Sequence, residues 1–278
     1  MKKLLIFLAI LFATIGGFIF HLFQREEGGV PILLYHQVND IDKDELTLTV
    51  EQFDAQVKYL LDEGYTIITP DELLDAWEGK GTLPPNPAVI TFDDGHVEMY
   101  KNVFPILKKY NVKATVFLVT DYLNLYPNYL TWDQAREMQE SGLVDFESHT
   151  LDHKTLTKIK SRDKIWDQLY NSKQAIEWYL KKPVNFIAYP GGKYDQDVES
   201  LANEAGYRAA FTRDYNLTHS LPQHHTLARI PIYGANNHTL LRFKLRLKGA
   251  PIFAPLQRYK DQLIIDDNPE IATLIWIP

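Results

Sequence analysis

Short apolar segments alternate with helix-forming segments along most of this chain, and this alternation limits its fold more than any other feature. Strands are expected at residues 30–35, 66–68, 88–92, 114–119, 144–147, 185–189, 209–212 and 227–232. Helices are expected between them, near residues 97–110, 162–180 and 195–205. Because repeated strand–helix units build a parallel sheet, we predict an α/β fold whose sheet closes as a distorted or incomplete (β/α) barrel.

Capping boxes predict the start of three more helices. In this pattern a threonine side chain accepts a hydrogen bond from the backbone N–H three residues later, and the residue at that position bonds back. The pairs are Thr49 with Gln52, Thr69 with Glu72, and Thr131 with Gln134.

Two polar runs lie directly after predicted strands. Asp93 and Asp94 follow one strand, and His149 and His153 follow another. Loops that follow barrel strands converge on one face, so side chains from distant parts of the sequence can share a site there. Each run alone is also typical of an ordinary turn or an unrelated histidine pair, but the two together favour a metal site.

The residue types suit a mononuclear hydrolytic site. Divalent ions bind imidazole nitrogen and carboxylate oxygen, and catalytic sites leave one position open for water. Asp94, His149 and His153 would form such a ligand set, because histidines four residues apart can face one point. Asp93 is then free to act as the base that takes a proton from water. Gly95 allows the sharp backbone turn that this arrangement needs.

Several runs of the sequence resemble the polysaccharide deacetylases of carbohydrate esterase family 4. The Thr-Phe-Asp-Asp-Gly run at 91–95 looks like the family's first motif, with Asp93 as base and Asp94 as metal ligand. His149 and His153 look like the second motif, and residues 100–117 and 188–192 resemble later segments. The resemblance covers about residues 30–232 and implies a (β/α)7-like barrel.

The chain also departs from the common family pattern. Ala188 or a neighbour stands where many members have an arginine, and no late histidine of the expected kind is present. His36 instead ends the first strand, which is similar to the subgroup of poly-N-acetylglucosamine deacetylases with permuted motifs. The resemblance implies that His36 is the general acid, with a structural strand-end histidine as the alternative. Arg229 is expected to supply the missing positive charge, with a solvated charge beside a strand as the alternative.

The resemblance further implies hydrolysis of N-acetyl groups on N-acetylglucosamine units, with release of acetate. The polymer would be a poly-N-acetylglucosamine exopolysaccharide or peptidoglycan. One divalent ion is expected, with zinc preferred over cobalt, nickel, manganese or iron. A backbone amide in the turn of Tyr189, Pro190 and Gly191 is expected to stabilise the oxyanion. Two other hypotheses remain: a de-O-acetylase of another glycan, and a non-catalytic surface protein that binds polysaccharide.

The amino terminus carries a membrane signal. Lys2 and Lys3 precede an apolar run at residues 4–23, which as a helix would measure ~30 Å, about the thickness of a bilayer core. We expect a membrane anchor at 1–23, a linker at 24–29 and a catalytic domain at 30–278. The basic pair predicts a single-pass protein of the cell membrane with an extracellular catalytic domain. A cleaved signal peptide and secretion are the alternative.

Composition excludes some classes of function. The net charge of −7 and the lack of a basic stripe argue against nucleic acid as a partner, and the absence of cysteine excludes disulfides and a lipoprotein anchor. We expect a monomer. Residues 240–248 are amphipathic and are expected to pack on the barrel or to touch a membrane. Among the remaining histidines, treated as surface or packing residues, His96 stands out because it follows the aspartate pair.

Overall fold

The structure is a computed structural model that describes residues 14, 16–17, 29–220, 224–234 and 239–278. The predicted anchor at 1–23 lies outside the described residues except at positions 14, 16 and 17, and residues 24–28 of the predicted linker also lie outside them. Among the residues that are described, no helix combines the length and the apolar character needed to cross a membrane.

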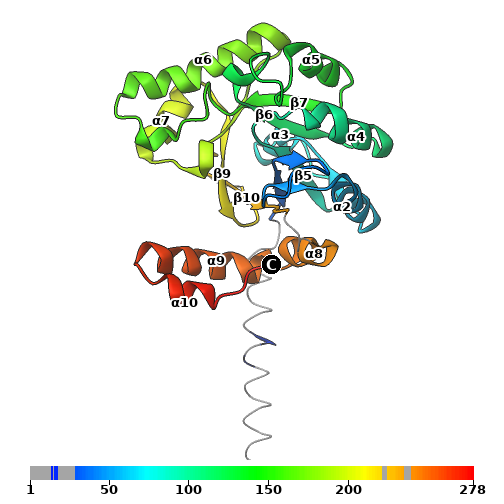
Figure 1. The fold of residues 1–278 in the computed structure, drawn as a ribbon, viewed down its shortest axis with the longest axis vertical. Coiled ribbons are helices and arrows are strands. Elements are labelled where there is room, and N and C mark those ends of the chain that lie inside the picture. Colours follow the sequence, from blue (N-terminus) through cyan, green and yellow to red (C-terminus); the bar gives the residue numbers. More distant parts are fainter. Residues whose placement is uncertain (1–13, 15, 18–28, 221–223, 235–238) are drawn as a thin grey trace, which may run out of the picture.

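Within the described ranges, parallel strands form a closed barrel (Figure 1). Around the ring the order is β1, β10, β9, β8, β7, β6 and β5, and pairing of β1 with β5 closes it. The predicted (β/α)7-like barrel is therefore confirmed. The bounds are β1 Ile32–Tyr35, β5 Pro87–Phe92, β6 Ala114–Leu118, β7 Val144–Ser148, β8 Phe186–Ala188, β9 Ala209–Tyr215 and β10 Leu227–Pro231.

Three short strands lie outside the ring. The expected strand at 66–68 is β4 (Thr66–Ile67), which pairs only with the first residues of β5. The other two, β2 (Gln37–Val38) and β3 (Thr47–Leu48), form a small parallel sheet of their own after β1.

Helices surround the barrel (Figure 1). They are α2 Val50–Asp62, α3 Pro70–Trp77, α4 Phe104–Tyr110, α5 Trp132–Glu140, α6 Arg162–Leu180 and α7 Gln196–Glu204. All three predicted capping boxes are present, at α2, α3 and α5. The helix expected at 97–110 is instead a π-helical turn, Met99–Val103, followed by α4, because Pro105 in the first turn of α4 offers no N–H to the preceding turn. A further group of helices, α8 Leu240–Lys248, α9 Ala250–Ile265 and α10 Pro269–Thr273, lies together at one side of the barrel.

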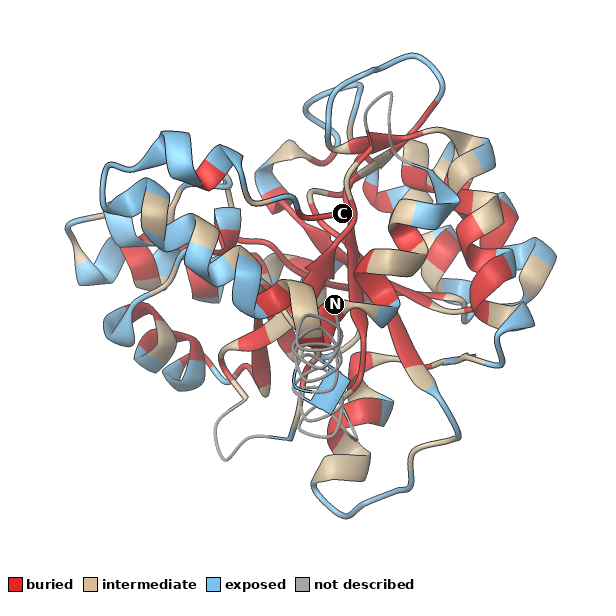
Figure 2. Cartoon of the chain, turned by 90° about the horizontal axis from the view of Figure 1, so that it is seen from below, coloured by how far each residue is buried: buried red, intermediate tan, exposed pale blue. Residues whose placement is uncertain are grey.

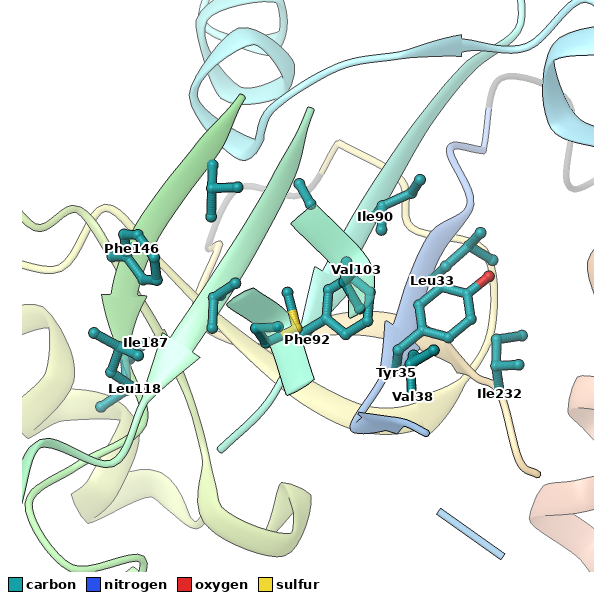
Figure 3. Close-up of a cluster of buried hydrophobic side chains, with 14 of the residues drawn as sticks. Leu33, Tyr35, Val38, Ile90, Phe92, Val103, Leu118, Phe146, Ile187 and Ile232 are labelled. Carbon is teal, nitrogen blue, oxygen red and sulfur yellow. The ribbon is translucent and has the colours of Figure 1, made fainter. Parts of the chain in front are cut away.

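Alternate residues of the strands feed two apolar clusters, as the two-residue period of a strand requires. One cluster includes Leu33 and Ile90, which Figure 3 shows. Helix residues such as Phe53 belong to the same cluster, so it lies between the strands and the helices. The other includes Ile32 and Val89 from the same strands and fills the barrel. Buried residues accordingly occupy the centre of the molecule, while exposed residues lie on the outer helices and loops (Figure 2). This packing leaves the carboxyl ends of the strands to carry polar groups.

Candidate metal centre

The predicted site residues follow the carboxyl ends of barrel strands. His36 comes directly after β1, Asp93 and Asp94 after β5, and His149 after β7. The Asp93 N–H donates to the carbonyl oxygen of Tyr35 at 3.0 Å, so His36 and Asp93 are neighbours across the paired strands. The closed barrel therefore brings together residues that lie far apart in the sequence.

Asp94, His149 and His153 form the predicted group of three possible metal ligands. One ligand atom from each lies within 4.8 Å of the other two. Oδ1 of Asp94 is 3.6 Å from Nε2 of His149 and 3.5 Å from Nε2 of His153. Asp94 and His149 are largely buried, whereas the side chain of His153 faces solvent in part. These two imidazoles and one carboxylate match the donors that zinc and similar ions prefer.

The orientation of His149 is set from behind the site. Its Nδ1 lies 2.7 Å from the carbonyl oxygen of Ala188. A carbonyl oxygen only accepts hydrogen bonds, so Nδ1 carries the proton and the lone pair of Nε2 points toward Asp94 and His153. With the proton on Nδ1, Nε2 is the nitrogen left to bind a metal ion, and the residues present therefore fit one.

The ligand loops have unusual backbone conformations. Asp94, Thr150 and His153 all have positive φ angles, of 74°, 71° and 59°. Such angles are uncommon for residues other than glycine and concentrate at functional sites. Gly95 has a φ of 78°, and a Cβ at this position would lie 2.6 Å from the Leu118 side chain. Gly95 therefore satisfies both a backbone and a packing constraint.

Asp93 is held by Arg229. The two guanidinium nitrogens Nη1 and Nη2 donate to Oδ1 and Oδ2 of Asp93 at 2.7 and 2.8 Å, and both side chains are buried. Arg229 also donates from Nε to the carbonyl oxygen of Thr212 at 2.8 Å. Burial alone would raise the pKa of Asp93, but the charge and hydrogen bonds of Arg229 outweigh it and lower that pKa. Arg229 is thus a buried charge paired with Asp93 and not a solvated one.

His36 lies beside this pair without a hydrogen bond at Nδ1. Burial lowers its pKa from 6.5 to about 4, although Asp93 and Asp94 act in the opposite direction. The imidazole is therefore neutral at pH 7 in the protein without ligand. The protonated form expected of a general acid is not its resting form.

In the turn after β8, two of the three residues expected near the oxyanion have no free backbone N–H. The Tyr189 N–H donates to the carbonyl oxygen of Phe211 at 3.0 Å, and Pro190 has no N–H. Neither residue can offer a backbone donor to an oxyanion, which leaves Gly191 from the predicted set. The Tyr189 ring is fully buried, and its hydroxyl donates to the carbonyl oxygen of His225 at 3.1 Å.

His96 belongs to the site, although the sequence singled it out only by its position. Its Nε2 is 3.4 Å from Oδ2 of Asp94. The other two histidines, His149 and His153, approach Oδ1 instead. Its ring stacks on Tyr129, with centroids 4.7 Å apart. The contact with Tyr129 comes from a loop after a different strand, so local sequence could not reveal it.

Comparison with known proteins gives related sequences and structures. A family profile described as polysaccharide deacetylase matches residues 80–210. The putative polysaccharide deacetylase YxkH of Bacillus subtilis is 30% identical over 185 residues, which cover 66% of this chain and 64% of that protein. The poly-beta-1,6-N-acetyl-D-glucosamine N-deacetylase of Staphylococcus epidermidis is 36% identical over 179 residues, covering 60% and 61%. The chain thus spans less than two thirds of the length of these relatives.

A solved structure extends the likeness to most of the described chain. The Streptococcus pyogenes deacetylase PplD, determined in complex with acetate, superposes with a TM-score of 0.73 at 27% identity. The match covers 79% of this chain and 98% of that one. The barrel and its surrounding helices are therefore shared with this deacetylase.

The pKa of His36 gives a test in solution. The folded chain binds the His36 proton more weakly than the unfolded chain does. The contribution of His36 to the free energy of unfolding is therefore fully present above pH 6.5 and is lost as the pH drops toward about 4. The shift corresponds to about 3 kcal/mol across that window. We expect urea unfolding of chelator-treated protein, at pH 7 and pH 4.5, to show a smaller loss in His36→Asn than in the wild type. Equal losses in the two proteins would contradict the assigned burial of a neutral imidazole.

Proposed function

We propose that the chain is a polysaccharide deacetylase of carbohydrate esterase family 4, a metal-dependent hydrolase that removes acetyl groups from N-acetylglucosamine units of an extracellular polysaccharide. The observation that carries this proposal is the group of Asp94, His149 and His153 beside the paired carboxylate of Asp93. A glycan-binding module would need neither the ligand set nor the base.

The metal is proposed to be zinc, held by Asp94, His149 and His153. The ion would supply a Lewis acid that activates water and polarises the acetyl carbonyl group. The two-imidazole, one-carboxylate donor set supports zinc, and cobalt, nickel, manganese and iron are the alternatives.

Asp93 is proposed to take the proton from the attacking water. Its two oxygens accept from Arg229, but each keeps a second lone pair that can receive this proton. Arg229 fixes the plane of the carboxylate and keeps it ionised. When the water oxygen bonds to the acetyl carbon, negative charge develops on the carbonyl oxygen. In the turn after β8, the Gly191 N–H is the donor proposed to bind this oxyanion.

His36 is proposed to protonate the leaving nitrogen when the carbon–nitrogen bond breaks. Acetate and a glucosamine unit are then released. The imidazole must first gain a proton, and the nearby carboxylates Asp93 and Asp94 favour that charged form. Negative charge on the substrate oxygen would favour it further, so the acid would be generated during turnover.

The roles of base and ligand are separable by substitution. We expect Asp93→Asn to keep its metal and lose activity by at least about a hundredfold, because an amide cannot accept the proton. His153→Ala should lose both metal and activity. The exposed Asp133→Asn, on α5, is the matched control and should keep both. Metal content and acetate release are measured on the same preparations, and an active Asp93→Asn would refute the assigned base.

The substrate is tested with a panel of acetylated glycans. Linear β-1,6 oligomers of N-acetylglucosamine, N-acetylated chito-oligomers and acetylated xylan are compared with and without a chelator. We expect acetate from N-acetylglucosamine oligomers, loss of this activity with chelator and recovery on adding zinc. Release from xylan alone would instead indicate a de-O-acetylase, and no release from any glycan would indicate a binding protein.

We also propose that the apolar run at residues 4–23 holds the chain in the cell membrane with the barrel outside. Gly29 and Val30, where the described barrel segment begins, line the same cavity as Leu247, Lys248 and Pro251 of α8 and α9. This supports a membrane surface near these helices, where many large apolar side chains are exposed. They are Leu240, Leu241, Leu256, Tyr259, Ile264, Ile265, Ile271, Leu274 and Trp276.

Trp276 reports on this location. It is 58% exposed, and Trp178 on α6 is 69% exposed and serves as the control. With the full chain in vesicles that contain brominated lipid, we expect lipid quenching of tryptophan fluorescence to fall in Trp276→Phe and to stay unchanged in Trp178→Phe. Quenching that is the same in both variants and in the wild type would count against a membrane near α8–α10.

A further inference from the structure

Three tyrosines cluster in the loop after β6. The ring centroids of Tyr122 and Tyr126 are 5.2 Å apart, those of Tyr122 and Tyr129 are 4.9 Å apart, and those of Tyr126 and Tyr129 are 6.2 Å apart. The cluster is not part of the core, since Tyr126 is 47% exposed and the neighbouring Leu125 is 65% exposed. Exposed apolar groups that gather in one place commonly mark a binding surface.

This tyrosine loop, residues 119–131, is fastened to both loops that carry the candidate metal ligands. On one side, the Leu130 N–H donates to the carbonyl oxygen of Gly95 at 3.0 Å, and Tyr129 stacks on His96. On the other side, the Tyr122 hydroxyl donates to the carbonyl oxygen of Asp152 at 3.1 Å. The loop is therefore bonded to Asp152, the residue before His153. It also reaches Asp94 through His96, which stacks on Tyr129 and lies 3.4 Å from Oδ2 of Asp94.

Two amide side chains line a cavity beside two of these tyrosines. Tyr126 and Tyr129 line a cavity of about 400 Å³, within the range of small-molecule sites, together with Asn124 and Gln134. The side-chain oxygens of Asn124 and Gln134 accept from the backbone N–H groups of Trp132 and Thr131 at 2.9 Å each. These bonds fix both amide groups and leave their NH₂ donors for hydroxyl groups of a ligand.

We propose that the tyrosine cluster is a platform on which a pyranose ring of the polysaccharide stacks, beside the unit that is deacetylated. This inference rests on the proposed function. The C–H face of a pyranose is apolar and fits a flat aromatic surface, while its rim of hydroxyl groups fits the amides of Asn124 and Gln134. A chain of several units would then gain affinity that a single N-acetylglucosamine lacks.

The test uses full-length Tyr126→Ala and Tyr126→Leu, with Tyr170→Ala as the control. Tyr170 is similarly exposed, at 37%, but lies on α6. Aromatic stacking is worth up to about tenfold in affinity, so we expect KM for N-acetylglucosamine oligomers to rise about three- to tenfold in both Tyr126 variants. Tyr126→Leu keeps apolar packing without the flat ring. We expect kcat, metal content and activity on the shortest substrate to be unchanged in both Tyr126 variants. All of these values, and KM, should be unchanged in Tyr170→Ala.

A second measurement separates this inference from the proposed function. Binding of the same oligomers to chelator-treated full-length protein is measured by calorimetry, which needs no turnover. Weaker binding by both Tyr126 variants supports the platform even if the wild type releases no acetate. Unchanged KM and unchanged binding in Tyr126→Leu would overturn it, as would a loss confined to kcat.

Discussion

The whole site depends on giving two adjacent carboxylates separate partners, so that both can stay charged. Asp93 and Asp94 follow the same strand, and two like charges in a medium of low polarity repel strongly. Each carboxylate has a different partner. Arg229 binds Asp93 from inside the barrel, and three histidines lie around Asp94 at the mouth. This division separates the proposed base, Asp93, from the proposed metal ligand, Asp94, although the two are adjacent in the sequence.

The ion pair of Asp93 and Arg229 also connects the site to the apolar interior of the barrel. The guanidinium carbon of Arg229 lies 5.6 and 5.9 Å from the ring centroids of Phe117 and Phe211, inside the barrel. A buried ion pair contributes little net stability but is costly to break, by about 3–5 kcal/mol when one partner is removed. The barrel packing therefore holds the proposed base, Asp93, in place, and movement of either strand would leave an unpaired buried charge.

Local patterns in the sequence predicted the parts of this structure that depend on local interactions. The capping boxes at Thr49, Thr69 and Thr131 formed as expected, because each is complete within four residues. The grouping of Asp94 with His149 and His153 followed from strand ends that converge in any barrel.

Contacts between strands were harder to predict. The hydrogen bond from the Tyr189 N–H to the Phe211 carbonyl oxygen depends on how β8 and β9 pair, which local sequence does not reveal. The contact of His96 with Tyr129 depends on a loop after another strand. The burial that leaves His36 neutral likewise comes from the assembled barrel. These long-range effects determine which groups are free to act, so the structure was needed to separate them.

The central claim is that Asp94, His149 and His153 hold one divalent ion. Crystals of the protein soaked with zinc, with anomalous diffraction recorded at the zinc edge, would test it most directly. The account predicts a single strong peak between the Asp94 carboxylate and the Nε2 atoms of His149 and His153. A peak elsewhere, or none in crystals of protein that deacetylates with the chelator present, would contradict it.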